Sequence, residues 1–297
     1  MLKKFAAMLA LCLLLTGCRA ASPEITTQSP QIAAPSATQA PATQPTQYQF
    51  PETVLVNNEH CAVTVRSIDP EGTFGYTMQV LLENRTDLEL MFSLREVSVN
   101  GFMCDPFFAA TVSPGMKANE EVSFLKEDLA ANGIADVTDI TFELVVYDSM
   151  DLLAEYLVEE DVTVYPQGEA AYRTYERQPQ PGDVVLFTNA DCAMTVTGFD
   201  PESSWGYAMH VFLENRTDDT LMFSASNVAV NGFMCDPYWA VEVAPGKKCN
   251  TQITWLESDL TENGITQVET ISLPVRVYES DDWVGGGILS ETFAITP

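Results

Sequence analysis

The chain has 297 residues, with 14 basic and 42 acidic side chains and a formal net charge of −28. A field of that sign repels phosphate backbones, so nucleic-acid binding is excluded as an expected function. Two histidines, His60 and His210, are too few for a histidine-based zinc site or a duplicated catalytic triad. No nucleotide-binding, metalloprotease or esterase motif occurs. We therefore expect a protein that is not an enzyme and needs no cofactor.

The N-terminal residues have the pattern of a bacterial lipoprotein signal peptide, assigned to residues 1–17. Lys3 and Lys4 precede an apolar run at 5–15, which is too short to span a bilayer. The sequence LTGC at 15–18 resembles a lipobox, which implies cleavage before Cys18 and a lipid on its thiol. The alternative is an ordinary signal peptide with an incidental cysteine. We expect a chain of net charge about −30 (12 − 42), lipid-anchored to the outer face of the cytoplasmic membrane at the bacterial cell surface.

Residues 18–50 form the next segment, rich in Ala, Ser, Thr, Pro and Gln. Such a composition cannot bury enough apolar surface to offset the entropy of ordering, so we predict a disordered tether. As a flexible coil, a segment of this length would span roughly 30 Å. A second segment of similar composition, at 167–184, is predicted to be a linker.

The most informative pattern is an internal repeat. Residues 54–166 recur as 185–297 at a constant offset of 131, without insertion or deletion. VNGFMCDPFFAATVSPG at 99–115, for example, becomes VNGFMCDPYWAVEVAPG at 230–246. Each copy has the size of one domain, so we predict two domains, at 51–166 and 185–297.

Within each repeat, short-range patterns predict strands. Residues 76–83, YTMQVLLE, have apolar side chains at the even positions, as in a half-buried strand. Asn100-Gly101 predicts a tight hairpin that pairs Val99 with Phe102. The tripeptides at 84–86 and 215–217, both Asn-Arg-Thr, predict a strand end followed by a turn.

One short helix per repeat is expected. Leu125 and Leu129 are four residues apart, and Gly133 followed by Ile134 is typical of a helix C-terminal cap. With about eight strands separated by regular turn signals, the pattern predicts an all-β fold of two tandem immunoglobulin-like antiparallel β-sandwich domains.

The segments LLENRT at 81–86, VSVNGF at 97–102 and V-x-P-G-x-K at 112–117 are similar to the telokin-like, immunoglobulin-fold repeats of bacterial surface lipoproteins. The resemblance spans both repeats and involves loop and core positions. It implies the sandwich fold and a location at the cell surface, and it implies no reaction.

Four cysteines occupy equivalent positions in the two repeats. Cys61 and Cys104 recur as Cys192 and Cys235, and the members of each pair are 43 positions apart. Strand alternation directs these thiols into the core, so we predict one disulfide within each repeat, with buried thiols as the alternative. Cys249 has no counterpart and is expected to serve packing.

Acidic residues gather in one loop of each repeat, at Asp148 and Asp151 and at Glu279, Asp281 and Asp282. Carboxylates on a loop could bind Ca²⁺, but their spacing is not that of an EF-hand and charged hairpin loops are common. We therefore assign no metal site and keep calcium as the alternative.

Alternation also turns apolar side chains outward at four equivalent places in each repeat. We expect these residues to line one exposed contact face, with the more aromatic second repeat binding more strongly. The alternative is that the linker, a loop or the other domain covers them. The eight residues are Leu81, Met91, Phe107, Tyr147, Phe212, Met222, Tyr238 and Tyr278.

These features together favour a non-enzymatic cell-surface lipoprotein whose repeats act as binding, adhesion or display modules. The expected partner is a protein or a glycan, besides the membrane that holds the lipid. The alternatives are a solute-binding lipoprotein of a transporter and an enzyme inhibitor. The strand-rich pattern argues against the solute-binding class, which is usually built from α/β lobes.

Overall fold

The computed structural model describes residues 49–151, 153–282 and 285–297. The predicted signal peptide, Cys18 and nearly all of the predicted tether lie outside these residues. Among the helices described, none has the length and apolar character needed to cross a bilayer. Strands dominate both repeats, and the all-β prediction is confirmed.

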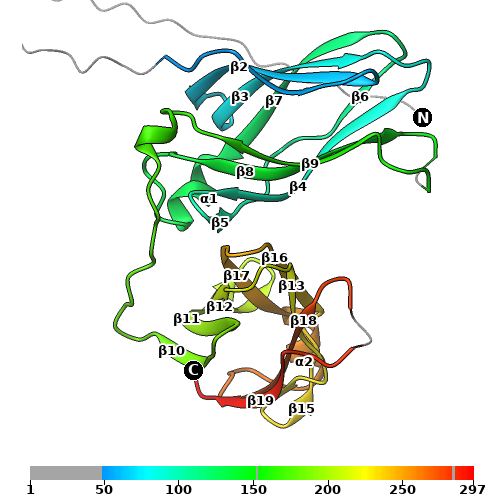
Figure 1. Ribbon diagram of the computed structural model, residues 1–297. Coiled ribbons are helices and arrows are strands. Elements are labelled where there is room, and N and C mark those ends of the chain that lie inside the picture. The colour runs from blue at the N-terminus through cyan, green and yellow to red at the C-terminus, as the bar shows by residue number, and fades with distance from the viewer. Residues whose placement is uncertain (1–48, 152, 283–284) are drawn as a thin grey trace, which may run out of the picture. The chain divides into compact units, whose positions relative to one another are not determined.

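The first repeat consists of two antiparallel sheets (Figure 1). One sheet has the strand order β1-β2-β3-β7, whereas the strands β5-β4-β8-β9, with β6 also paired to β4, form one part of a nine-stranded sheet. The elements are β1 (Thr53–Asn57), β2 (Cys61–Gly72), β3 (Gly75–Asn84), β4 (Leu90–Val99), β5 (Phe102–Met103), β6 (Ala110–Val112), β7 (Lys117–Leu125), α1 (Lys126–Ala131), β8 (Ile140–Asp148) and β9 (Val158–Val164).

The second repeat follows after a connection that contains the 3₁₀ turn η1 (Glu169–Ala171). Its strands β10-β11-β12-β17 are the other part of the nine-stranded sheet, in which β17 pairs with β5 in parallel at Lys248 and Phe102. Its second sheet has the order β15-β14-β18-β13-β16, with β19 paired to β18. The elements are β10 (Val184–Thr188), β11 (Cys192–Ser203), β12 (Gly206–Asn215), β13 (Leu221–Ala225), β14 (Ala229–Val230), β15 (Phe233–Met234), β16 (Trp239–Val243), β17 (Lys248–Leu256), α2 (Glu257–Glu262), β18 (Ile271–Glu279) and β19 (Leu289–Ile295). Each repeat is an immunoglobulin-like β-sandwich with one short helix.

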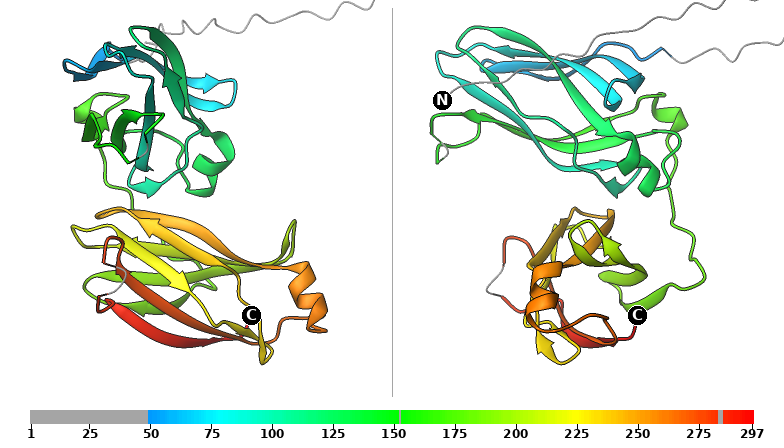
Figure 2. Two further views of the ribbon diagram at one scale, coloured as in Figure 1. Left: turned by 90° about the vertical axis from the view of Figure 1, so that its right-hand side faces the viewer. Right: turned by 180° about the vertical axis from the view of Figure 1, so that it is seen from behind.

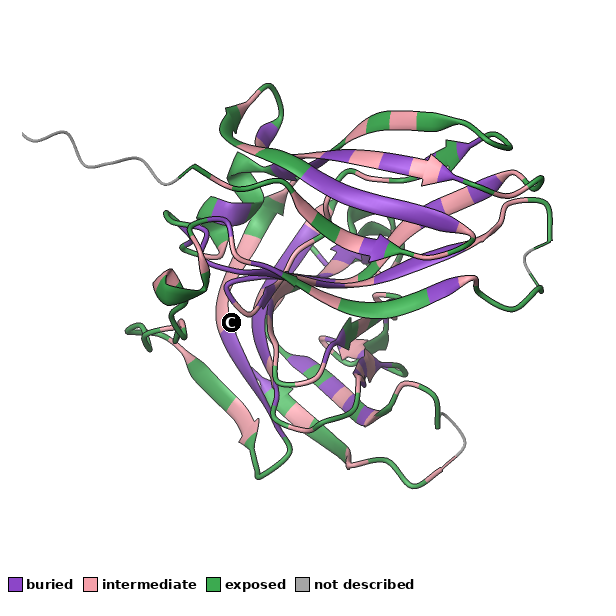
Figure 3. Cartoon of the chain, turned by 45° about the horizontal axis from the view of Figure 1, so that its top comes forward, coloured by how far each residue is buried: buried purple, intermediate pink, exposed green. Residues whose placement is uncertain are grey.

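Each sandwich has its own hydrophobic core, built by the alternation of side chains along the strands. In β3, Met78, Val80 and Leu82 are buried, while Gln79 and Leu81 are only half-buried. The same alternation of buried and exposed positions is visible along many strands in Figure 3. Apolar burial on these inner faces is the main term that stabilises each sandwich.

The predicted hairpin and helix cap are both present. Asn100 and Gly101 have φ values of 51° and 80°, and Val99 faces Phe102 across the turn. After α1, Gly133 has a φ of 69°, and the amide of Ile134 donates to the carbonyl oxygen of Leu129 at 2.8 Å. This geometry closes the helix C-terminus with a left-handed residue.

Leu125 differs from its expected role. It precedes α1 as the N-cap residue and is exposed, whereas Leu129 is buried. The outward side chain of Leu125 follows from strand alternation, because it is the last residue of β7 and its neighbour Phe124 points into the core.

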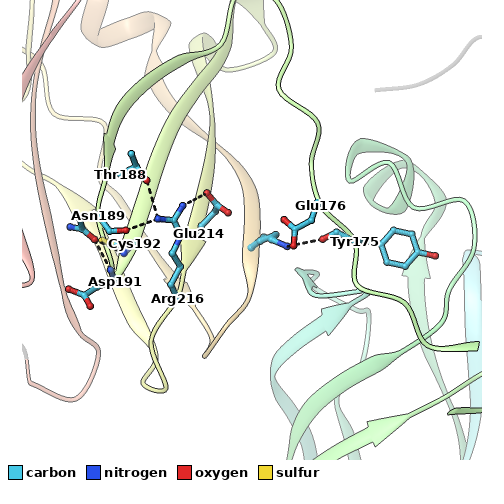
Figure 4. A network of polar contacts seen from close by, with 9 residues as sticks. Tyr175, Glu176, Thr188, Asn189, Asp191, Cys192, Glu214 and Arg216 are labelled. Atoms are coloured by element: carbon cyan, nitrogen blue, oxygen red, sulfur yellow. Dashed lines mark hydrogen bonds and ion pairs between the residues drawn. The ribbon is translucent and has the colours of Figure 1, made fainter. Parts of the chain in front are cut away.

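A polar network fixes the turn after β12, where the Asn-Arg-Thr tripeptide lies (Figure 4). The guanidinium of Arg216 donates to the carbonyl oxygen of Asn189 at 2.6 Å and to Thr188 Oγ1 at 3.0 Å, and pairs with Glu214 at 3.0 Å. Arg216 therefore ties the turn after β12 to the end of β10. This is the strand end and turn that the sequence predicts.

Candidate functional site

The connection between the two long antiparallel strands β11 and β12 presents a tryptophan at one end of the second sandwich. Trp205 is 71% exposed and is followed by Gly206, which has a φ of 136°. The carbonyl oxygen of Trp205 accepts a hydrogen bond from the amide of Glu257 at 3.1 Å, which ties this hairpin to the first residue of α2. Figure 2 shows α2 at this end of the sandwich.

Tyr238, between β15 and β16, is the second exposed aromatic residue at this end. Its side chain is 95% exposed, and its φ is 49°. A left-handed conformation is unusual for a bulky residue and costs about 1–3 kcal/mol when the surrounding structure imposes it. Tyr238 therefore combines an exposed ring with an unfavourable backbone conformation.

Trp205, Tyr238 and Leu256 line one shallow hollow of about 340 Å³, and we call them the aromatic cluster of the second repeat. Two carboxylates, those of Asp236 and Asp259, line the same hollow. The site thus combines two flat apolar rings with hydrogen-bond acceptors that carry negative charge.

Equivalent residues are exposed in the first repeat. Phe74, Phe107 and Leu125 lie 131 positions before the cluster residues, and Phe74 and Phe107 are 65% and 84% exposed. The amide of Phe107 donates to the carbonyl oxygen of Ser123 at 2.8 Å, which places Phe107 beside β7. We call this set the aromatic cluster of the first repeat.

Carboxylates accompany the first cluster as well. Asp105 and Asp128 correspond to Asp236 and Asp259 of the second repeat. Burial, followed by the charges of Glu127 and Asp105, raises the pKa of Asp128. The negative charges at this end of the sandwich are therefore close enough to oppose one another.

The predicted contact face is only partly exposed. Phe107 and Tyr238 are the two most exposed of the eight residues, but Phe212 is buried at 7% exposure. Its ring lies 6.4 Å from that of Phe102, and the guanidinium of Arg177 stacks over it at 5.3 Å. The prediction for Phe212 is therefore wrong, because a hairpin of the first repeat and the linker cover the ring.

The remaining predicted residues are half-buried and do not form one patch with Phe107 and Tyr238. Leu81 lies on β3, in one sheet, whereas Met91 and Tyr147 are cross-strand neighbours on β4 and β8, in the other sheet. Met222 and Tyr278 are paired in the same way on β13 and β18. A single face containing all four positions of a repeat is therefore wrong, because the residues are divided between two sheets and a loop.

The prediction of one disulfide within each repeat is also wrong. All five cysteines in the described part of the chain are free thiols. Cys61 pairs with Asn84 at one end of the sheet, whereas Cys104 contacts Asn132, just after α1, at the other end. Cys192 pairs in the same way with Asn215, the equivalent of Asn84, while Cys235 is close to Asp259 of α2. A disulfide needs Cα atoms within about 7 Å, which opposite ends of a strand do not provide.

These thiols should be unreactive until the protein unfolds. Burial raises the pKa of Cys61 and of Cys192 to about 11, and that of Cys249 to about 12, so the reactive thiolate is scarce at neutral pH. For a chain that begins after Cys18, we expect five slowly reacting thiols at pH 7.5 that all react rapidly in denaturant without reductant. The absorbance change of a thiol-reactive chromophore measures the number of thiols and their reaction rates in both conditions. One rapidly reacting thiol in denaturant would instead support the disulfides.

The acidic loops have structural roles. Asp148 accepts a hydrogen bond from the amide of Met150 at 2.9 Å, and Asp151 accepts one from the amide of Leu153 at 3.1 Å. The loop of the second repeat includes residues 283–284, which the structure does not describe. Among the residues it does describe, no group of three or more His, Cys, Asp or Glu is arranged to hold a metal ion.

Sequence reasoning did not identify Phe74, Trp205, Leu125 or Leu256 as surface residues of interest. The available signal was an aromatic residue directly before Gly75 and Gly206, where a hairpin must turn. An aromatic side chain at such a position has no core to enter, and a copy in each repeat strengthens the inference.

Comparisons with known proteins add little to this description. No protein-family model and no curated protein match the chain. Among solved structures, 28 chains match, including one from the CsuC–CsuE chaperone–tip adhesion subunit pre-assembly complex of archaic chaperone-usher Csu pili of Acinetobacter baumannii. That match has 12% identity, covers 74% of this chain and 91% of the other, and has a TM-score of 0.21, which carries no functional argument.

Proposed function

We propose that the protein is a non-enzymatic bacterial surface lipoprotein, anchored through a lipid on Cys18, that binds a neutral glycan through its two aromatic clusters. The observation that carries the proposal is the exposure of equivalent apolar triads in both repeats. Phe74, Phe107 and Leu125 are exposed in the first repeat, and Trp205, Tyr238 and Leu256 in the second. The substitutions between copies keep these side chains large and apolar.

Exposed rings of this kind are suited to recognition. Tryptophan and tyrosine provide large apolar faces with a polar edge, and they dominate the binding energy of many contact surfaces. Tyr238 also has a left-handed backbone conformation, as expected for a residue kept for function at some cost in stability.

The chemistry around the rings favours a glycan. Sugar rings present an apolar face that packs on an aromatic ring, and their hydroxyl groups donate hydrogen bonds to carboxylates such as Asp236 and Asp259. The net charge of −28 disfavours acidic polymers, so the proposed ligand is neutral. Two clusters on one chain would also increase the avidity for a repeating polymer.

A double substitution tests this proposal. Trp205→Ser with Tyr238→Ser should reduce binding to insoluble neutral polysaccharides by at least about thirtyfold, the loss of roughly 2 kcal/mol that is typical of central contact residues. Co-sedimentation with glucan, mannan and galactan particles measures the affinity. The melting temperature should change by only a few degrees, because both side chains are exposed.

Phe233→Ser is the matched control, because Phe233 is a 50% exposed aromatic residue of the same repeat outside the cluster. It should leave the affinity unchanged. The equivalent double substitution at Phe74 and Phe107 should weaken binding less, since phenylalanine lacks a polar edge. Equal binding by the wild type and the Trp205/Tyr238 variant would overturn the proposal. So would a wild-type protein that binds none of the three polysaccharides.

A further inference from the structure

Each repeat has a pocket at its helix end, distinct from the aromatic cluster. The two pockets are built from equivalent segments: the end of β2 or β11, the start of β3 or β12, the short helix and the loop after it. The pocket of the first repeat has a volume of about 440 Å³, and that of the second repeat about 830 Å³. The two repeats therefore contain equivalent pockets that differ in their free volume.

The first pocket is partly filled by the chain itself. Phe50, from the segment ahead of the repeat, lines the pocket and packs against the core. Lys126 and Glu71, which also line it, form an ion pair with 2.6 Å between Nζ and Oε2. In this pocket the ring of Phe50 thus packs on the apolar surface, and the ammonium group of Lys126 neutralises the carboxylate of Glu71.

The second pocket has neither of these groups. Glu202 corresponds to Glu71, but Glu257 stands where the first repeat has Lys126. Both carboxylates line the second pocket, and neither forms an ion pair with any described residue. Pro181 stands at the position of Phe50 and does not line the pocket.

A buried polar atom lies at the second pocket. Tyr207, one of the lining residues, is 7% exposed, and its hydroxyl group has no hydrogen-bond partner. Its ring is packed at 6.2 Å from Phe199 and 6.1 Å from Trp255. Burial raises the pKa of Tyr207 to about 12, so the hydroxyl is protonated at neutral pH and can donate. Buried hydroxyl groups are usually paired, and the residue that carries this unpaired one lines the pocket.

We propose that the pocket of the second repeat binds an aromatic amine. The ammonium group of the ligand takes the place of Lys126 and lies between Glu202 and Glu257. Its ring takes the place of Phe50 on the apolar surface formed by Phe199, Leu260 and Ile265, with Tyr207 available for a hydrogen bond. The first repeat, whose pocket already contains Phe50 and the ion pair of Lys126 with Glu71, does not bind this ligand.

Phenethylamine is the probe for this site, because two carbons join its ring to its ammonium group. Isothermal titration of the purified full-length chain at pH 7 and low salt should show saturable binding at one site. 2-Phenylethanol, which is neutral, and phenylacetate, which is anionic, should each bind at least about tenfold more weakly, since they lack the cation. Equal affinity for all three compounds, or no saturable binding of phenethylamine, would overturn the proposal.

Charge exchange between the repeats provides matched variants. Glu257→Lys installs the ion pair of the first repeat and should weaken phenethylamine binding by at least about tenfold, with little effect on folding. Lys126→Glu makes the reverse change in the first repeat and should leave that affinity unchanged, because Phe50 still fills the first pocket. Loss of binding in Lys126→Glu but not in Glu257→Lys would contradict the assignment to the second repeat.

Tyr207→Phe removes the unpaired hydroxyl and should weaken phenethylamine binding severalfold, whereas Tyr76→Phe in the first repeat should have no effect.

These titrations contain no glycan, so their outcome is independent of the proposed glycan binding. The double variant at Trp205 and Tyr238, which does not line this pocket, should bind the amine as the wild type does. Joint loss of both ligands in that variant would show one site instead of two.

Discussion

Gly206→Ala is expected to destabilise the second repeat by about 4 kcal/mol or more, a loss far above that of an ordinary substitution. The φ of Gly206 is 136°, a region that only glycine adopts readily. A Cβ atom there would clash with the carbonyl oxygen of Trp255 and lie 2.5 Å from the amide nitrogen of Glu257. Both atoms belong to backbone that pairs β12 with β17 or begins α2, so neither can move cheaply.

Tryptophan fluorescence measures this effect selectively, because all four tryptophans of the chain lie in the second repeat. Trp255 is buried and should report loss of the core during urea unfolding. Gly246→Ala is the matched control: its φ is 65°, but a Cβ atom there meets nothing within 4 Å. We expect it to cost about 1 kcal/mol. Similar losses for the two variants would show that the close approach at Gly206 is unimportant.

The same glycine positions the aromatic cluster. Trp205 precedes Gly206 in the hairpin, and its carbonyl oxygen is hydrogen-bonded to the start of α2. The equivalent Gly75 has a φ of 137°, and a Cβ atom there would clash with the carbonyl oxygen of Phe124. The close approach of hairpin and strand that each sandwich requires therefore also places an aromatic residue in solvent in both repeats.

Local signals account for the part of the fold that could be predicted from the sequence. Alternation along β3 identified its buried side chains, and Asn100-Gly101 identified a hairpin, because both depend on residues close in sequence. The helix was found from Leu129 and its glycine cap. Leu125 was assigned to the wrong element because a four-residue spacing also fits the end of a strand followed by a helix.

Contacts distant in sequence could not be predicted in this way. Alternation places Phe212 on the outer face of β12, but only the folded chain shows that Phe102 and Arg177 cover it. The equal separation of the cysteines in the sequence likewise says nothing about their distance in space. In the folded chain, Cys61 and Cys104 lie at opposite ends of the sandwich. Phe107 and Tyr238 were identified as exposed, but their partners Phe74 and Trp205 lie in tight turns between strands, where strand alternation gives no information.

Asn215→Ala should destabilise the second repeat by about 3 kcal/mol, because one buried side chain satisfies several backbone groups. Asn215 is 2% exposed, and its Nδ2 donates to the carbonyl oxygens of Asp219 at 2.7 Å and Val243 at 2.8 Å. Its Oδ1 accepts from the amide of Thr217 at 2.9 Å and from Thr217 Oγ1 at 2.8 Å. Alanine would remove all of these hydrogen bonds, including the buried one to the carbonyl oxygen of Val243. The melting temperature of the repeat should fall by more than about 10 °C.

Two further variants test whether the hydrogen bonds are responsible. Asn263→Ala, which removes a half-buried amide bonded to Asp259, should cost only about 1 kcal/mol. Asn215→Asp keeps the acceptor but places a carboxylate against two carbonyl oxygens, so burial should raise its pKa in the folded state. A raised folded-state pKa stabilises the protonated form, so the loss relative to the wild type should be larger at pH 7 than at pH 4. A loss independent of pH, or equal losses for the two alanine variants, would contradict this role of Asn215.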